Sequence, residues 1–336
     1  MKKISKTPVI AIVGATGLVG SEMRTILEQH KVPCAELRLF ASKDSAGEFY
    51  KFNDQEVEVE LLTEDVFEGV DIALFGTSAE LSAKYVPLAA KAGAVAIDNS
   101  SFFRMDPAVP LIVPEVNLSA IKAEDMIIAN PNCSTIQLVA VLNTIQRIAG
   151  LKHVIVSTYQ SVSGAGKAAL DELWGQTLAV FNQQELPQEA FQHQIAFNCI
   201  PQIDVLLDNG FTKEEFKIIH ESRKILGLPH LRITATAVRV PVFYSHAESV
   251  FIETERPFEL EDIIRHLSES EGLAIHPAHD EYPMQFDVAG TDEVHVGRIR
   301  RDESVDNGLN LWIVADNVRK GAALNAVQIA EKLIAH

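Results

Sequence analysis

The segment Asn130-Pro131-Asn132-Cys133-Ser134-Thr135 holds the residues of this chain that are best suited to chemistry. Asn132 is a good N-cap and Pro131 stops a helix from extending backwards, so we expect a helix with Cys133 in its first turn. A thiol there lies at the positive end of the helix dipole and ionises more readily. The free N–H groups of the same turn can stabilise an oxyanion on a carbonyl that the sulfur attacks. A lone cysteine is more often a small buried apolar residue, so the rest of the chain must decide.

Composition limits the class of protein. A length of 336 residues suggests two joined domains, and 47% hydrophobic with 22% charged residues is typical of a soluble globular protein. The net charge of −17 argues against a nucleic-acid binder. Three widely spaced cysteines indicate no disulfide framework, and no apolar run reaches membrane-spanning length. We therefore expect a cytoplasmic protein with neither nucleic acid nor membrane as a partner.

A dinucleotide-binding turn opens the chain. The apolar run Val9–Val13 predicts a buried parallel strand, and the turn after it leads into a helical pattern that ends near Glu28. In such a turn, glycines let the backbone approach a pyrophosphate that lies on the helix N-terminus. The cofactor-binding residues expected there are Gly14, Thr16, Gly17, Leu18 and Val19.

The elements that follow predict an α/β protein with a Rossmann-type parallel sheet and a second, α+β domain. Strands are expected at 35–41, 71–75 and 94–97, with a helix at 80–92. Beyond residue 150, strands are expected at 153–162, 231–242, 248–255, 294–301 and 309–315, and helices at 166–181, 212–226 and 260–269. We expect a dinucleotide-binding domain of residues 1–132 completed by the C-terminal helix 318–336, and a catalytic and dimerisation domain of residues 133–317.

The end of the second strand bears on the choice of cofactor. NAD-binding chains commonly place an acidic residue there to bond the ribose 2′-hydroxyl. Here the loop reads Ser42-Lys43-Asp44-Ser45, whose hydroxyls and lysine could hold the 2′-phosphate of NADP, although Asp44 opposes a phosphate. We expect NADP, with Ser42, Asp44 and Ser45 at the cofactor.

Two histidine-containing segments are candidates for chemistry in the second half. On an extended strand or its bend, Arg239 and His246 could project into one cleft from opposite ends. His246 stands out only beside a nucleophile that needs a base. The segment from His276 to Asp280 contains two histidines but lacks thiolates and a second ligand pair, so we expect no metal site.

These motifs together resemble the bacterial aspartate-β-semialdehyde dehydrogenases over residues 9–333. The matching motifs are Gly14-Ala15-Thr16-Gly17, Asp98 to Arg104, Asn130 to Thr135, Gln160 to Gly166, Arg239 to His246 and Ala315-Asp316-Asn317. The resemblance implies a homodimer that converts 4-phospho-L-aspartate to L-aspartate 4-semialdehyde and phosphate with NADPH. This reaction serves the biosynthesis of lysine, diaminopimelate, threonine and methionine.

The resemblance also implies the roles of single residues. Cys133 attacks the acyl phosphate, and the thioester that results accepts hydride, because a thioester is more electrophilic than a carboxylate. His246 is expected to act as acid and base near neutral pH, and Gln160 to orient the thiol or the substrate. The expected substrate-binding residues are Asn132, Arg239 for the α-carboxylate, Glu221 for the α-ammonium group, and Lys224 and Arg104 for the phosphate. Ser163, Gly164 and Asn317 are expected at the nicotinamide.

Two alternatives remain open at this stage. The first is an N-acetyl-γ-glutamyl-phosphate reductase-like enzyme, whose acylated substrate amine has no charge to pair with Glu221. The second is a non-catalytic relative that acts as a binding protein. Such a relative tends to lose its nucleophile, whereas Cys133, Gln160, Arg239 and His246 are all present.

The position of Asp44 yields a prediction. A carboxylate repels the 2′-phosphate of NADP, whereas an arginine at this position would bind it through charge-assisted hydrogen bonds. Asp44→Arg should therefore raise the ratio of kcat/KM for NADP to that for NAD. A native chain that already strongly prefers NADP, together with a variant that leaves the ratio unchanged, would show that Asp44 points away from the cofactor.

Overall fold

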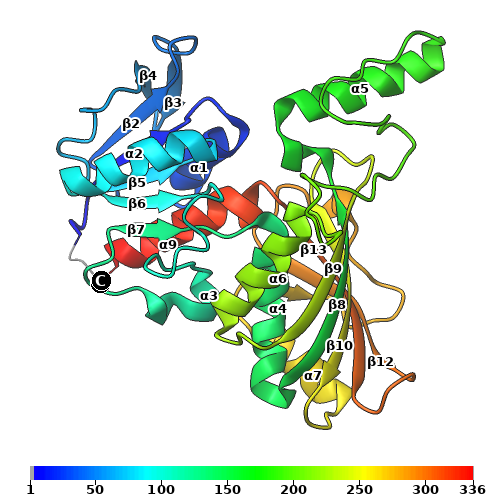
Figure 1. The fold of residues 1–336 in the computed structure, drawn as a ribbon. Helices are drawn as coiled ribbons and strands as arrows, with labels where there is room; N and C mark the ends of the chain where they lie inside the picture. Colours follow the sequence, from blue (N-terminus) through cyan, green and yellow to red (C-terminus); the bar gives the residue numbers. More distant parts are fainter. Residues whose placement is uncertain (1–3, 336) are drawn as a thin grey trace. The chain divides into compact units, whose positions relative to one another are not determined.

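The computed structural model describes residues 4–335, and the chain divides into two compact units (Figure 1). One unit contains the chain up to Asn132 together with the segment from Ala322 onward, and the other contains Cys133–Gly321. Each unit has its own sheet and its own apolar core. The expected combination of a Rossmann-type domain with an α+β domain is confirmed.

The first unit contains a seven-stranded sheet in the order β3-β4-β2-β1-β5-β6-β7. All pairs are parallel except the hairpin of β3 and β4. Asn53 and Asp54 join these two strands, and both have the positive φ that a tight hairpin turn requires, at 48° and 62°. The strands are β1 Val9–Val13, β2 Glu36–Ala41, β3 Phe49–Phe52, β4 Gln55–Leu61, β5 Ile72–Phe75, β6 Val95–Asp98 and β7 Ile127–Ala129.

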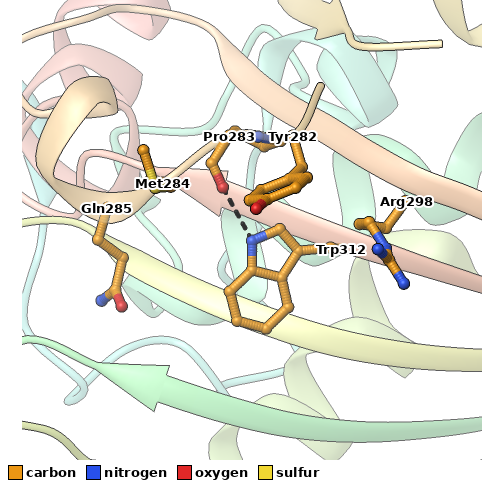
Figure 2. Close-up of a pocket in the computed structure, with 6 residues that line it drawn as sticks. All are labelled: Tyr282, Pro283, Met284, Gln285, Arg298 and Trp312. Atoms are coloured by element: carbon orange, nitrogen blue, oxygen red, sulfur yellow. Dashed lines mark hydrogen bonds between the residues drawn. The ribbon is translucent and has the colours of Figure 1, made fainter. Parts of the chain in front are cut away.

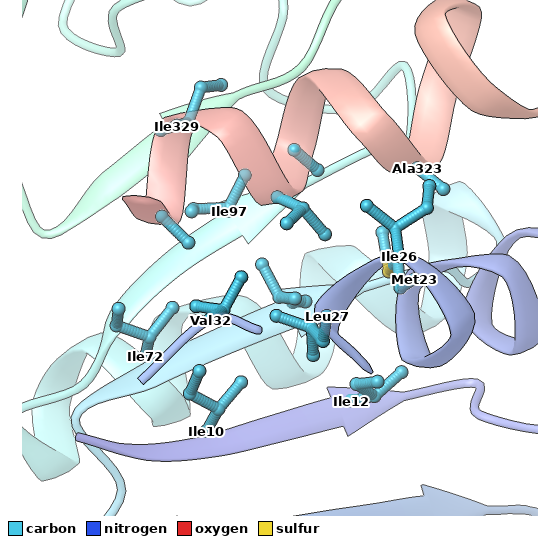
Figure 3. Close-up of a cluster of buried hydrophobic side chains, with 14 of the residues drawn as sticks. Ile10, Ile12, Met23, Ile26, Leu27, Val32, Ile72, Ile97, Ala323 and Ile329 are labelled. Atoms are coloured by element: carbon cyan, nitrogen blue, oxygen red, sulfur yellow. The ribbon is translucent and has the colours of Figure 1, made fainter. Parts of the chain in front are cut away.

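The C-terminal helix completes the core of the first unit (Figure 3). Apolar side chains of this helix, α9, pack with those of α1 and of the central strands, as the labelled Ile329 of α9, Ile26 of α1 and Ile97 of β6 show. Because each fully buried aliphatic side chain contributes about 1.5–3 kcal/mol, the expectation that this helix returns to the first domain has a clear physical basis. The helices are α1 Leu18–Gln29, α2 Ala79–Ala92, α3 Pro114–Asn117, the short 3₁₀ turn Leu118–Ala120 and α9 Leu324–Ile334.

The second unit contains a six-stranded mixed sheet in the order β11-β12-β13-β10-β8-β9. β8 pairs with β9 in parallel and with β10 antiparallel, and β10 pairs with β13 antiparallel. The antiparallel β12 and the parallel β11 extend the sheet beyond β13. The strands are β8 Leu151–Gln160, β9 Arg232–Arg239, β10 His246–Thr254, β11 Leu273–Ile275, β12 Val294–Asp302 and β13 Gly308–Ala315.

Three helices of the second unit, α4, α6 and α7, bury apolar side chains against one face of this sheet. α6 begins with a capping box, in which Thr212 and Glu215 satisfy each other's backbone N–H groups. Glu215 also accepts a hydrogen bond from the backbone N–H of Ala237 at 2.9 Å, which ties the start of α6 to β9. The helices are α4 Cys133–Ala149, the 3₁₀ turn Val162–Ala165, α5 Lys167–Asn182, α6 Lys213–Leu226, α7 Leu260–Ser268, α8 Gln285–Val288 and the π-helical turn Arg319–Ala323.

The structure corrects one expected feature of the second unit. Arg239 and His246 do not lie on a single strand, because β9 ends at Arg239 and β10 begins at His246, with β8 between them in the sheet. Residues 240–245 form the connection between these two strands. The two side chains therefore come together across strands rather than along one.

Candidate active site

The register of the second sheet places three expected site residues in one row. On β8, Gln160 pairs with Arg239 of β9 on one side and with His246 of β10 on the other, and His246 pairs in turn with Ala315 of β13. All three functional side chains are buried, with 5% or less of each exposed. The row thus brings a cation, an amide and an imidazole to one end of the sheet.

Cys133 is the first residue of α4, which confirms the expected position of the thiol at a helix N-terminus. The helix packs against β8, β10 and β13, the strands that carry or adjoin the row. Cys133 also acts electrostatically on Arg239. Gly321 lies close to the cysteine, since a Cβ atom built on this glycine would be 2.9 Å from the Cβ of Cys133. The sulfur-bearing residue is therefore packed against the backbone and lies beside the guanidinium.

His246 is held in one tautomer. Its Nδ1 atom accepts a hydrogen bond from the backbone N–H of Ser161 at 3.1 Å, so the neutral ring carries its proton on Nε2. Among the described residues, Nε2 has no hydrogen-bond partner. Burial and the charge of Arg239 lower the pKa of His246 to about 3. The ring is thus neutral at pH 7, which corrects the expectation of an imidazole that titrates near neutrality.

Gly164 lets the imidazole and the guanidinium approach its backbone closely, because it has no side chain. A Cβ atom on this glycine would lie 2.9 Å from Nη1 of Arg239 and 3.0 Å from Nε2 of His246. Nη1 of Arg239 also donates to the backbone oxygen of Ser161 at 2.7 Å. Burial lowers the pKa of Arg239, and nearby Glu214 opposes that shift. A side chain at position 164 would therefore collide with both the imidazole and the guanidinium.

Glu214 and Lys217 are site residues that the sequence analysis missed. Nε2 of Gln160 donates to Oε1 of Glu214 at 3.3 Å, and Lys217 forms ion pairs with Glu214 at 3.0 Å and with Asp204 at 2.9 Å. Burial lowers the pKa of Lys217, but the two carboxylates outweigh it and hold this pKa above its ordinary value. Charges of both signs thus lie at the start of α6, beside the row of Gln160, Arg239 and His246.

The assignment of Glu221 and Lys224 to the substrate stays a prediction, and this arrangement offers a second carboxylate and lysine for the same roles. Glu221 lies seven residues after Glu214 on α6, which is two helical turns or about 10 Å along the axis. Glu214, not Glu221, is hydrogen-bonded to Gln160. A carboxylate lies three residues before a lysine twice on this helix, as Glu214 with Lys217 and as Glu221 with Lys224. The capping box at the start of α6 holds the first of these pairs beside Gln160.

The first unit holds Arg104 in a fixed position at the carboxyl ends of its parallel strands. The side chain is 8% exposed, and it donates to the backbone oxygens of Asn130 at 2.9 Å and of Asn99 at 2.7 Å. The side chain of Asn130 donates to that of Asn99 at 2.6 Å. Asn132, at the end of the same segment, is buried.

The glycine-rich turn of the first unit fits a dinucleotide. Gly14 has a φ of +82°, and a Cβ atom on Gly20 would lie 2.2 Å from the carbonyl oxygen of Gly14, so the turn admits only glycine at these positions. Gly17 caps α1 without a side-chain hydrogen bond, and the first turn of α1, all of it described, contains no acidic residue. The first N–H groups of the helix, at Leu18 and Val19, can therefore meet an anion.

The loop that could contact the adenosine ribose is linked to this turn. Oγ1 of Thr16 donates to Oγ of Ser45 at 3.3 Å. The carbonyl of Ser42 accepts the backbone N–H groups of Ser45 and Ala46, and Ser42, Lys43 and Asp44 are exposed. The expected cofactor residues of this unit are thus brought together, while the remaining ones, Ser163, Gly164 and Asn317, belong to the second unit.

A separate cavity of about 370 Å³ lies on the other face of the second sheet (Figure 2). Trp312 lines it, with its Nε1 donating to the backbone oxygen of Pro283 at 3.0 Å. Trp312 pairs with Ser249, and side chains alternate along a strand, so Trp312 and His246 lie on opposite faces. This cavity is therefore distinct from the site at the row.

A metal-binding cluster and a membrane-spanning helix are not found in the described part of the chain. Within residues 4–335, no group of three or more His, Cys, Asp or Glu residues could hold a metal ion. The ring of His276 is instead hydrogen-bonded to that of His295 at 3.1 Å. No described helix is long and apolar enough to span a membrane.

Comparison with known proteins identifies the family. Residues 9–124 match the family model of the semialdehyde dehydrogenase NAD binding domain, and residues 142–320 match that of the semialdehyde dehydrogenase dimerisation domain. Aspartate-semialdehyde dehydrogenase 2 of Vibrio cholerae is 51% identical over 328 residues, which cover 97% of each chain. The chain belongs to the aspartate-semialdehyde dehydrogenase family.

Further members of the family agree over nearly the whole chain. The aspartate-semialdehyde dehydrogenase of Aquifex aeolicus is 49% identical over 331 residues, again 97% of each chain. A crystal structure of aspartate semialdehyde dehydrogenase II from Vibrio cholerae complexed with ASA superimposes with a TM-score of 0.96 at 50% identity. That match covers 98% of this chain and 99% of the other.

Glu248 is a buried acid beside the row. It lies two residues after His246 on the same face of β10, and its side chain is fully buried. Burial raises the pKa of Glu248 well above its ordinary value, and the side-chain amide of Gln137 on α4 opposes the shift only in part. The acid is therefore protonated in the folded protein at pH values where the unfolded chain is ionised.

The raised pKa of Glu248 predicts a pH-dependent loss of stability. Stability should fall as pH rises above the unfolded pKa, about 4.3, because only the folded state retains the proton. Glu248→Gln removes this loss, so the Tm of the variant minus that of the wild type should be larger at pH 8 than at pH 5.

The matched control is Glu253→Gln on the same strand. A hydrogen bond from Lys152 lowers the pKa of Glu253, so it is ionised in both states over this pH range and its Tm difference should not depend on pH. Equal Tm differences at pH 5 and pH 8 for Glu248→Gln would contradict a protonated Glu248.

Proposed function

We propose that the protein catalyses the NADPH-dependent reductive dephosphorylation of 4-phospho-L-aspartate to L-aspartate 4-semialdehyde and phosphate. In the first step the Cys133 thiolate forms a C–S bond with the acyl carbon, and the C–O bond to phosphate breaks. In the second step the thioester carbon gains a hydride and the C–S bond breaks, which returns the thiolate. The observation that carries the proposal is the placement of Cys133 at a helix N-terminus, on a helix that packs against the strands of Gln160 and His246.

Covalent chemistry at Cys133 is supported by its surroundings. The N-terminus of α4 favours the thiolate, and the guanidinium of Arg239 acts on the same group. His246 donates from Nε2, so it can stabilise the negative charge that develops on the carbonyl oxygen when the thiolate adds. The charge of Arg239 is one of the two causes of the low pKa of His246. A substrate anion that pairs with Arg239 offsets this charge, so substrate binding raises the pKa of His246 toward the range in which the ring can accept a proton.

The charges of the site complement those of the substrate. Arg239 provides a forked donor for the α-carboxylate, and Glu214 provides a carboxylate for the α-ammonium group. Lys217 and, from the first unit, Arg104 are the cations assigned to the phosphate, and Asn132 is assigned a contact with the substrate. Lys217 and Glu214 here replace Lys224 and Glu221, because the former pair adjoins Gln160. An N-acylated substrate would offer Glu214 no ammonium group to bind.

NADPH supplies the hydride when it is bound. We assign the pyrophosphate to the N-terminus of α1, where Gly14 and Gly20 permit the tight turn and Gly17, Leu18 and Val19 present the backbone. Thr16, Ser42 and Ser45 are assigned to the adenosine side, and Ser163 and Gly164 to the nicotinamide. We assign Lys43, a cation in the same loop as Ser42 and Ser45, to the 2′-phosphate of NADPH.

The remaining expectations form part of the same proposal. A chain of this activity would serve the biosynthesis of lysine, diaminopimelate, threonine and methionine in the cytoplasm. We propose a homodimer, which the match of residues 142–320 to a dimerisation domain supports. Exposed apolar side chains of the second unit, such as Trp174 and Phe181 of α5 at 59% and 75% exposure, are of the kind that a protein interface covers. Light scattering should therefore give the mass of two chains.

The proposed activity is tested by adding L-aspartate 4-semialdehyde and NADP to the purified protein. Formation of NADPH should require phosphate or arsenate, because either anion must release the acyl group from sulfur. NADPH formation that does not depend on these anions, or turnover of N-acetyl-glutamate semialdehyde instead, would contradict the proposal.

Replacement of the nucleophile gives a direct prediction. Cys133→Ser should bind NADP and keep its Tm, but lose nearly all turnover, because a hydroxyl is a far weaker nucleophile at neutral pH. Cys199→Ser is the matched control, since this exposed cysteine lies outside the site and should be replaceable without loss of kcat. Substantial turnover by Cys133→Ser would rule out the covalent mechanism.

Variants of two lysines on α6 distinguish the assignment of the phosphate to Lys217 from its assignment to Lys224. Lys217→Ala should raise the KM for phosphate at least ~10-fold, which corresponds to the loss of one charge-assisted contact of about 1.5–3 kcal/mol. Lys224→Ala, one lysine further along the helix, should leave this KM unchanged. The opposite pattern would restore Lys224 as the phosphate ligand.

A further inference from the structure

Asn317 accepts three hydrogen bonds at a single atom. Its Oδ1 receives the backbone N–H of Ser245 at 2.9 Å, the hydroxyl of Ser163 at 3.0 Å and the hydroxyl of Ser161 at 3.1 Å. Because a backbone amide can only donate, the atom at this position must be the amide oxygen. Asn317 is 4% exposed and lies two residues after the end of β13. Its oxygen is thus occupied by donors of this chain.

Two of the three donors adjoin His246. Ser161 gives its backbone N–H to Nδ1 of the imidazole, and its hydroxyl lies 3.1 Å from the same atom. Ser245 directly precedes His246 and has a φ of +69°, a left-handed conformation that is strained for a residue with a side chain. A strained conformation persists only where its surroundings fix it, and the bond from Ser245 to Asn317 is one such restraint.

We propose that Asn317 is a positioning residue, which fixes the orientation and the tautomer of His246 through Ser161 and Ser245. The Ser161 amide can point at Nδ1 only while the loop after β8 is held in place, and Asn317 holds this loop at both Ser161 and Ser163. With Nδ1 kept as an acceptor, the imidazole proton stays on Nε2, which lies close to Gly164. The expected effect of Asn317 on turnover rests on the proposed function, whereas its expected effect on the tautomer of His246 does not.

This role differs from the contact with nicotinamide that the sequence suggested for Asn317. A residue that only binds the cofactor would change the affinity for NADP when replaced, and it would leave the unliganded imidazole as it is. A positioning residue would change the imidazole itself. The two roles therefore separate in a measurement that needs neither substrate nor cofactor.

The experiment is ¹⁵N NMR of imidazole-labelled full-length protein, with the His246 signal assigned by its loss in His246→Asn. The wild type should show the Nε2–H tautomer, and Asn317→Ala should show a mixture of tautomers. The kcat of Asn317→Ala should fall by about 10²-fold, because a small displacement of a catalytic group is enough for such a loss. Its Kd for NADP should stay unchanged.

Two further variants make the test specific. Asn310→Ala, on the same β13, removes a hydrogen bond to Asp302 far from the row, so it should leave both the His246 signal and kcat unchanged. Asn317→Asp keeps an oxygen acceptor and should retain the Nε2–H signal, so it remains informative if the alanine variant does not fold.

The proposal would be overturned by an Nδ1–H tautomer in the wild type. It would also be overturned if Asn317→Ala kept the wild-type tautomer and kcat while its affinity for NADP fell. A wild type that shows the Nε2–H tautomer and does not turn over the semialdehyde would refute the proposed function and would leave the positioning role supported.

Discussion

The pairing of β9, β8 and β10 is the constraint on which the site depends. Backbone hydrogen bonds between the strands fix this register, and they place Arg239, Gln160 and His246 side by side although Gln160 and His246 lie 86 residues apart in the sequence. A slip of one residue in either strand pair would turn a side chain to the opposite face, where Trp312 and its cavity lie. The apolar residues that pack α4 and α6 on this face therefore also keep the site assembled.

The pairing of these strands also determines the pKa shifts of the buried side chains in the site. Arg239 and His246 are both removed from water and both lie close to Gly164, and the charge of Arg239 disfavours the charged form of the imidazole. Glu214 is the carboxylate that offsets Arg239, and the capping box of α6 holds it there. The site thus holds a buried cation beside a neutral imidazole.

The sequence predicted the features that depend on local signals. The glycine turn, the start of α4 at Cys133 and the packing of α9 in the first unit follow from capping, periodicity and glycine spacing, and the structure agrees. The hairpin of β3 and β4 was missed, although the Asn53-Asp54 turn between alternating residues signals it. The choice between Glu214 and Glu221 needed tertiary structure, because both carboxylates lie three residues before a lysine. The lowered pKa of His246 likewise arises from burial and from Arg239, which comes from another strand.

The central claim is that the acyl group passes through a thioester on Cys133, and peptide mass spectrometry tests it most directly. The protein is mixed with L-aspartate 4-semialdehyde and NADP in the absence of phosphate, quenched in acid and digested. The account predicts one aspartyl adduct per chain, on the peptide that contains Cys133, together with NADPH equal to the adduct and release of the adduct when phosphate is added before the quench. Full turnover of the semialdehyde with no adduct, or with an adduct on another residue, would contradict it.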